Sequence, residues 1–285
     1  MERHRELTGR LWEQIKGLLP DHPVRGGRWR DHRRVIESVA WKYRTGAPWQ
    51  DLPQDFGPWQ TAYNRFRRWA NDGTWTRLLT HLHTQADATR DIDWLVSIDS
   101  TVVRAHQHAT GARPPSGPST EPSDHALGRS RGGLTTKIHL AADGRCRPLA
   151  LLVSAGHRHD SSYFEAVMNR IRVPRTGPGR PRSRPVQVSA APAYSSRAIR
   201  TYLRQRGIKA VIPEPANQIA NRKRRGTRGG RPPAFDPGTY KIRNTVERCI
   251  GRLKQWRGIA MRTDKLAIHY EAAVHIAAVF IWAAA

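Results

Sequence analysis

The hydrophobic residues of this 285-residue chain change their spacing near residue 94, and this change separates two kinds of structure. After it, WLVSIDSTVV is a short apolar run that indicates a strand ending near Asp99. We therefore expect a helical domain over residues 1–90 and a second domain over residues 91–285. Before the change, apolar residues recur at the spacing typical of amphipathic helices, and they include Leu7, Leu11, Ile15, Leu18, Val35, Ile36, Val39 and Tyr43.

The second domain alternates between strand and helix patterns. A β-hairpin is expected at LTTKIHLAADGRCRPLALLVSAG, with its turn at Asp143-Gly144, followed by a helix that Asp160 caps. This order predicts an α/β fold with a mixed sheet and flanking helices, and it argues against a doubly wound parallel sheet. Further strands are expected near 186–190 and 209–213, further helices at 195–206, 239–257 and 269–284, and loops at 105–133 and 214–238.

Residues 46–73 predict two helices joined by a turn rich in Gly and Pro, and the second helix is rich in arginine. This arrangement is typical of a helix-turn-helix, in which Arg65, Arg67 and Arg68 would contact DNA. The same residues also suit a small helical bundle with aromatic side chains inside and solvated arginines outside. The sequence leaves these two interpretations open.

The charge of the chain indicates a polyanionic partner. Lys and Arg number 49 and Asp and Glu 23, which gives a formal net charge of +26. Such an excess favours nucleic acid as the partner. A membrane is not expected, because the cations are spread along the chain. The apolar C-terminal run AAVHIAAVFIWAAA is shorter than the roughly 20 residues of a membrane span, and two cysteines are too few for a disulfide framework.

The predicted helix over residues 239–257 has two different faces. At about 100° per residue, Tyr240, Arg243, Glu247 and Lys254 fall within a stripe of about 60°. A separate apolar face can pack on a sheet, and it consists of Ile242, Val246, Ile250 and Leu253. By geometry alone, the polar stripe is a solvated face with an Arg243–Glu247 ion pair one turn apart.

The same four residues form a pattern, Tyr-x2-Arg-x3-Glu-x6-Lys, that resembles the signature of bacterial insertion-sequence transposases of the DDE type. Such enzymes have a ribonuclease-H-like core. The resemblance extends over nearly the whole chain. It includes SIDST (97–101), GHRHDS (156–161), AYSSR (193–197) and the front segment GAPWQDLP with FGPWQTAYNRFRRW.

The resemblance implies three carboxylates that hold two Mg²⁺ ions and cut double-stranded DNA at the terminal inverted repeats of an element before joining it to a target. Asp99 matches the first carboxylate and Glu247 the third. Arg243 and Lys254 would hold DNA phosphates, and Tyr240 would help to position them. The resemblance also implies a homodimer on DNA, in the cytoplasm at the bacterial nucleoid.

The second carboxylate is where the chain departs from the family. Members usually read Ala-Asp-Lys-Ala-Tyr before a helix, whereas this chain reads AAPAY, with Ala191 in place of the aspartate and Pro192 in place of its neighbour. Two carboxylates are a poor ligand set for two Mg²⁺ ions. We therefore expect impaired catalysis with DNA binding retained. Asp160 is a weaker candidate for the missing ligand, since the family also carries an acidic residue there.

Two other functions are compatible with the sequence. One is a non-catalytic DNA-binding protein or a repressor derived from a transposase. The other is a histidine-metal hydrolase, because the pairs His106/His108 and His157/His159 have ligand-like spacing. We favour loop and supporting roles for these histidines, since no acid–base glutamate accompanies either pair.

Overall fold

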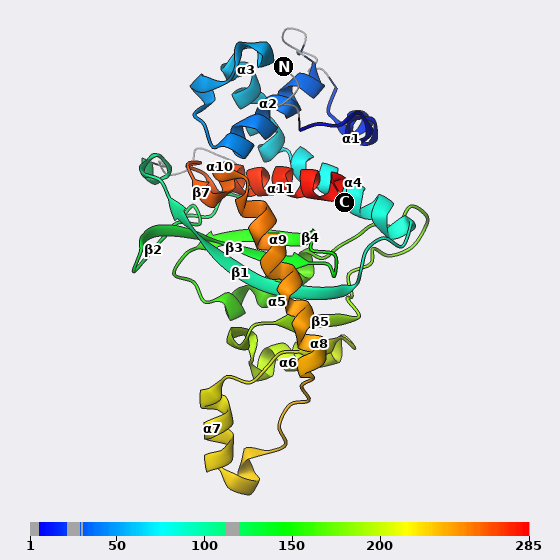
Figure 1. Ribbon diagram of the computed structural model, residues 1–285, viewed down its shortest axis with the longest axis vertical. Coiled ribbons are helices and arrows are strands. Elements are labelled where there is room, and N and C mark those ends of the chain that lie inside the picture. Colours follow the sequence, from blue (N-terminus) through cyan, green and yellow to red (C-terminus); the bar gives the residue numbers. More distant parts are fainter. Residues whose placement is uncertain (1–5, 22–28, 30, 112–119, 285) are drawn as a thin grey trace.

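The computed structural model describes residues 6–21, 29, 31–111 and 120–284. Four helices, α1–α4, precede the sheet, as the periodicity predicts, and α1–α3 lie at the top of Figure 1. The connection between α2 and α3 spans residues 46–58 and contains two single-turn 3-10 helices, so it is longer than the short turn expected of a helix-turn-helix. The helices are α1 (Gly9–Ile15), α2 (His32–Thr45), α3 (Trp59–Asn71) and α4 (Thr74–Ala88).

The strands of the described chain form one mixed sheet, which confirms the predicted α/β class. β1 pairs antiparallel with β3 and parallel with β5, and β5 pairs parallel with β6. β2 and β4 both pair with β3, and β7 pairs with the end of β1. The strands are β1 (Leu95–Ala105), β2 (Gly128–Ser130), β3 (Gly133–Ala142), β4 (Pro148–Ala155), β5 (Gln187–Ala190), β6 (Lys209–Val211) and β7 (Met261–Arg262).

Asp99 lies inside β1, and the prediction that this strand ends near Asp99 is wrong. Pairing with β3 continues as far as Arg104 and extends the strand beyond the residues whose apolar pattern first revealed it. The parallel pairing with β5 ends earlier, at Ile98 and Ala190. Asp99 and Ala191 therefore each stand one residue past the last pair of two neighbouring strands.

Helices cover both faces of the sheet and join it to the N-terminal helices. α9 (Asn244–Lys254) crosses β1 and β3, and α5 (Phe164–Arg170) packs on β3 and β4. α11 (Ala267–Ala283) lies with α4 between the sheet and α1–α3 (Figure 1). It is buried almost all round, as expected for the C-terminal apolar run. A single apolar core includes both Leu7, which precedes α1 in the sequence, and Trp282 in α11.

One expected helix and two expected loops differ in detail from the structure. The long helix expected at 239–257 consists of α8 (Pro237–Tyr240), a 3-10 turn and α9, with α10 (Arg257–Ala260) after it. The loop expected at 214–238 contains α7 (Ala216–Arg224), which projects at the lower end of Figure 1. Within the expected loop 105–133, residues 112–119 lie outside the described ranges, and the rest contributes β2.

Four further findings concern the remaining predictions. α6 (Arg197–Gln205) follows β5, and Ser196 caps it. The hairpin turns at Asp143, whose carboxylate accepts the backbone N–H groups of Arg145 and Arg147. Both cysteines are buried and free. None of the helices in the described ranges is long and apolar enough to cross a bilayer.

Candidate active site

Asp99 and Glu247 are brought together through a shared arginine. One terminal nitrogen of Arg243 donates to Asp99 Oδ2 at 2.5 Å, and the other donates to Glu247 Oε1 at 2.7 Å. The side chains of Asp99 and Arg243 are only 17% and 21% exposed, while Glu247 is half exposed. Geometry along the helix suggested only the Arg243–Glu247 pair, and the fold adds Asp99 to it.

Hydrogen bonds fix the start of α9 against β1 and so position this group. Ser97 Oγ donates to the carbonyl oxygen of Ile242 at 3.3 Å, and Thr245 Oγ1 donates to Ser97 Oγ at 3.1 Å. Ser97 and Asp99 are two residues apart on β1, so both project from the face that α9 covers. The contact between Asp99 and Arg243 therefore follows from where α9 docks.

Burial governs the electrostatics of Asp99. Desolvation raises the pKa of its carboxyl above the ordinary value, although the Ser100 backbone N–H, at 2.8 Å, and Arg243 both favour the ionised form. For Arg243, burial opposes the charged form, but Asp99, Tyr240 and Glu247 together outweigh it and the pKa rises. The two ions thus neutralise each other in a partly dry setting, where such a pair is more strongly coupled than in water.

Ala191 stands beside Asp99 on the same face of the sheet. Ile98 pairs with Ala190, and the backbone of Ala191 remains extended, so the next residues of both strands project from the opposite face together. Ala191 packs, partly buried, against the apolar core. The position next to Asp99 on the neighbouring strand therefore holds a methyl group.

Asp160 belongs to the other face of the sheet. Its carboxylate accepts from Lys137 Nζ at 2.7 Å, and it lies close to Ser100 and His139. These three residues share the strand face opposite to Asp99. Burial alone would raise the pKa of Asp160, but the bonds from Lys137 and Ser100 lower it. The prediction that Asp160 caps a helix is wrong, because this carboxylate is bound to Lys137.

Tyr194 is a neighbour of the site that the sequence did not reveal. It is buried, and burial raises the pKa of its hydroxyl, with Asp160 and Asp99 adding to the shift. It belongs to the AYSSR motif, but only the fold shows that its ring packs near Phe164, with centroids 5.9 Å apart, and that its hydroxyl lies within reach of both aspartate charges. The signal available in the sequence was its position just after the end of a strand.

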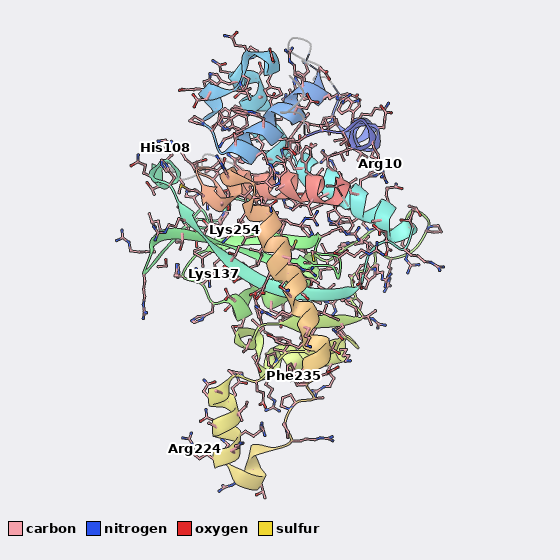
Figure 2. All side chains as sticks on the ribbon, viewed as in Figure 1. Arg10, His108, Lys137, Arg224, Phe235 and Lys254 are labelled. Atoms are coloured by element: carbon pink, nitrogen blue, oxygen red, sulfur yellow. The ribbon has the colours of Figure 1, made fainter. Side chains whose placement is uncertain are left out.

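The other residues of the polar stripe also face β1. Tyr240 lies close to Arg243, Asp99 and Glu247, and its ring contacts Phe235 edge to face at 5.3 Å. Lys254, labelled in Figure 2, donates to the carbonyl oxygen of Val102 at 3.3 Å. Burial lowers the pKa of Lys254. The stripe therefore faces β1 at both of its ends, and it lies next to Asp99 at the end that carries Tyr240 and Arg243.

The arginines of α3 differ in their surroundings. Arg67 and Arg68 are exposed, whereas Arg65 is buried, with 6% of its surface accessible. The Arg65 guanidinium stacks on the Trp29 ring at 3.5 Å and donates to His32 Nδ1 at 2.9 Å. The expectation that Arg65 contacts DNA is therefore corrected, because its charged group is occupied inside the helical region.

The histidine pairs do not form a ligand cluster. The rings of His106 and His108 lie side by side, with centroids 4.4 Å apart. Across the described ranges, no three His, Cys, Asp or Glu side chains are grouped in a way that could hold a metal ion. This geometry gives the histidine-metal hydrolase interpretation no support.

A family model described as "Transposase DDE domain" matches residues 91–282. The chain belongs to this transposase family. A second model, described as "Putative transposase of IS4/5 family", matches residues 7–79. The two matches meet near the change in hydrophobic spacing that the sequence shows.

Curated relatives agree with this assignment. The putative transposase for insertion sequence element IS6501 of Brucella ovis is 28% identical over 149 residues, which cover 52% of this chain and 98% of the relative. An uncharacterized protein, y4sN, of Sinorhizobium fredii is 39% identical over 104 residues, 36% of this chain and 78% of the relative. Among solved structures, the Mos1 transposase paired-end complex is 12% identical over 84% of this chain and 82% of that chain, with a TM-score of 0.25. A TM-score this low does not establish a common fold.

Divalent metal is typical of DDE transposases, but the side chains of this member do not form a complete two-metal site. Arg243 already bridges the carboxylates of Asp99 and Glu247, the two predicted ligands. The methyl group of Ala191 stands next to Asp99, and Asp160 is bound to Lys137 on the other face. The donor set therefore lacks both the ligand and the free negative charge that two Mg²⁺ ions require.

Proposed function

We propose that this chain is a transposase that binds the ends of its element and whose own strand cleavage is impaired. The observation that carries the proposal is the register of β1 and β5, which brings Ala191 beside Asp99 on the face that α9 covers. In an intact DDE site this neighbouring residue is the second carboxylate. Asp99 and Glu247 are then the remaining two carboxylates of a magnesium site.

Charge balance gives the physical reason for impairment. Two carboxylates facing one guanidinium carry a single excess negative charge, and Mg²⁺ gives up its water only for well-placed oxygen ligands. A third carboxylate would add charge and a ligand on the strand next to Asp99. The parallel order of β1 and β5, with α9 after the sheet, supports the ribonuclease-H-like assignment made from the motifs.

DNA binding is proposed to use both parts of the chain. Residues 1–90 would form the helical DNA-binding domain, with Arg67 and Arg68 exposed on α3, and residues 91–285 the ribonuclease-H-like domain. Tyr240 and Lys254 would contact phosphates near the site, and Arg243 would do so once it is released from Asp99. The partners are the double-stranded terminal inverted repeats and the target, bound by a homodimer.

The test is to restore the carboxylate. Ala191→Asp, alone and together with Pro192→Lys, is assayed for nicking of a duplex that carries the terminal inverted repeat, with Mg²⁺ and with EDTA. We expect cleavage that needs Mg²⁺ and exceeds that of the unchanged protein by at least about 100-fold, since metal catalysis depends on a full ligand set. Ala191→Asn, with the same shape and no charge, is the matched control and is expected to stay inactive.

Two outcomes oppose the proposal in different ways. Equal cleavage by the unchanged protein would show that Ala191 does not impair the site. The second candidate function, a DNA-binding repressor, is favoured by the Arg243 bridge, which closes the site with an internal cation. It predicts that Ala191→Asp binds the duplex and still fails to cut, and that the unchanged protein blocks cleavage by an active relative.

A further inference from the structure

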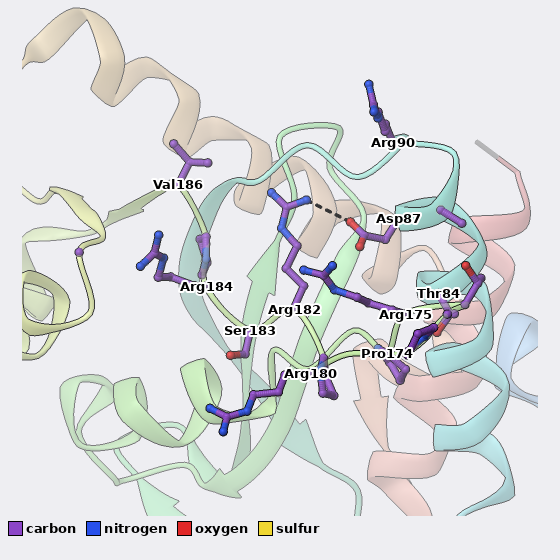
Figure 3. A pocket seen from close by; sticks show the side chains of 17 residues that line it. Thr84, Asp87, Arg90, Pro174, Arg175, Arg180, Arg182, Ser183, Arg184 and Val186 are labelled. Atoms are coloured by element: carbon purple, nitrogen blue, oxygen red, sulfur yellow. Dashed lines mark hydrogen bonds and ion pairs between the residues drawn. The ribbon is translucent and has the colours of Figure 1, made fainter.

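A cavity of about 860 Å³ lies at the end of α4, against the loop that leads into β5. Figure 3 shows the arginines around it, drawn from the segment 174–186 and from the turn after α4. Four of them are exposed, namely Arg90, Arg175, Arg180 and Arg184. We call these four the edge arginines.

The edge arginines are not neutralised by the protein. Asp87 is the acidic residue in the lining, and its carboxylate is engaged by Arg182 at 3.2 Å. Within the described ranges, none of the four edge arginines forms an ion pair. A concave surface with four uncompensated guanidinium groups attracts anions, and the planar fork of arginine matches the oxygens of phosphate.

The segment that carries three of these arginines is held in place. Arg175 and Arg180 lie in a loop that is closed by a pair of backbone hydrogen bonds between Val173 and Arg182, at 2.9 and 2.8 Å, and Arg184 follows two residues later. The Arg182 guanidinium stacks on the Trp94 ring at 4.0 Å while it binds Asp87. Prolines at 178, 181 and 185 restrict the backbone further. Little conformational entropy is therefore lost when an anion binds.

The cavity lies away from Asp99 and Ala191. Its lining residues come just before the strands: Arg90 precedes β1, Val186 precedes β5 and Gly207 precedes β6. These three strands are parallel, so the cavity is at their amino ends. Asp99 and Ala191 follow the other end of the β1–β5 pairing, which is four residues long, or about 13 Å at roughly 3.3 Å per residue.

We propose that the edge arginines bind the phosphate backbone of a duplex DNA segment other than the one next to Asp99 and Glu247. This inference rests on the proposed function, because it assumes that the chain binds DNA. A small-molecule site is disfavoured, since such sites are mostly apolar and enclosed, whereas this one is open and lined by exposed cations. Two separate DNA contacts on one sheet suit a protein that handles an element end together with flanking or target DNA.

The test measures how DNA affinity depends on salt. Arg175→Gln, Arg180→Gln and Arg184→Gln are combined in one variant, and binding to a random-sequence duplex is titrated over a fourfold range of salt. If each arginine neutralises one phosphate, the slope of log K against log salt falls by about 2.7. Over that range the unchanged protein would then lose about 40-fold more affinity than the variant.

Two further variants separate local contact from net charge. Arg104→Gln, Arg129→Gln and Arg131→Gln remove the same charge from exposed positions at the end of β1 and around β2, and this control is expected to keep the original slope. Replacing Arg175, Arg180 and Arg184 with lysine is expected to restore the slope, since the charges remain.

Each outcome decides one claim. Equal slopes for the edge variant and the unchanged protein, or equal losses in the edge variant and its control, would overturn the inference. Circular dichroism of all variants should match, because the substituted side chains are exposed. Absence of DNA binding by the unchanged protein would instead overturn the proposed function.

Discussion

At the carboxyl end of the pairing between β1 and β5, Arg243 bridges Asp99 and Glu247, whereas at the amino end of that pairing the edge arginines have no acidic partner. Both regions are rich in charge and both border the same sheet. Charges that satisfy one another stabilise the fold and are unavailable to a ligand. Charges left unpaired on a rigid loop contribute little to stability and remain available to a polyanion.

The proposed function offers a reason for this difference. A complete DDE site would hold an excess of negative charge that bound metal relieves. With Ala191 next to Asp99, the guanidinium of Arg243 faces two carboxylates and neutralises one of their two charges. The edge arginines have undergone no such balancing, since the nearest acid, Asp87, is engaged by Arg182.

The largest change in stability is expected from removing Arg243, the cation that bridges Asp99 and Glu247. Arg243→Gln leaves Asp99 and Glu247 without a cation, and breaking a largely buried ion pair of this kind should destabilise the fold by about 2 kcal/mol. The two freed carboxylates should also bind a divalent cation better. The melting temperature of Arg243→Gln is therefore expected to rise with Mg²⁺, while that of the unchanged protein does not respond.

Arg248→Gln is the matched control for this change, because Arg248 is an exposed arginine on the same helix, α9. It should leave both the melting temperature and the response to Mg²⁺ unaltered. A melting temperature of Arg243→Gln that ignores Mg²⁺ would show that the bridge does not stand in for a metal ion.

The same contrast occurs within a single helix, α3, with a smaller expected effect. Arg65→Gln loses the stacking on Trp29 and the hydrogen bond to His32, which should cost about 1–2 kcal/mol of unfolding free energy. Arg67→Gln combined with Arg68→Gln should change stability by less than about 0.5 kcal/mol and weaken DNA binding. Urea unfolding and a binding titration on both variants check this, and reversed effects would contradict the assignment.

The sequence predicted local geometry well because helix and strand periods are local properties. The 3.6-residue period placed Arg243 and Glu247 on one face, and the motif located Ala191 at the end of a strand. The bridge from Arg243 to Asp99 was not predictable, since 144 residues separate them and only the docking of α9 on β1 brings them together. Burial of Arg65 was missed for the same reason, because its partner Trp29 belongs to another segment.

The sequence also did not predict the full length of β1, the short strand β2 or the cavity that the edge arginines share. β1 extends to Ala105 because β3 runs beside it, although its own apolar pattern fades earlier. β2 is three residues long and exists through its pairing with β3. Three of the edge arginines lie close together in the sequence, in VPRTGPGRPRSRP (173–185), but the cavity that they share with Arg90 depends on the end of α4, which is distant in the chain.

The smallest expected effect is on the pH dependence of stability, which should have opposite signs for Asp99 and Asp160. Burial raises the pKa of Asp99 above its ordinary value near 3.8, so the folded state holds this proton more tightly than the unfolded state. The contribution of Asp99 to stability is therefore full below the ordinary pKa and is lost as pH rises through the raised one. Asp99→Asn cannot ionise, so its stability relative to the unchanged protein should increase with pH across that window.

Asp160 should behave in the opposite way, because the bonds from Lys137 and Ser100 outweigh burial and lower its pKa. Its contribution is present above the ordinary pKa and is lost as pH falls through the lowered one, so Asp160→Asn should lose relative stability as pH rises through that range. Urea unfolding of both variants from about pH 3 to 7 measures the two slopes, at about 1.4 kcal/mol for each pKa unit of difference. Slopes of the same sign would contradict the opposite pKa shifts of the two carboxyls, with the pKa raised by burial for Asp99 and lowered by hydrogen bonds for Asp160.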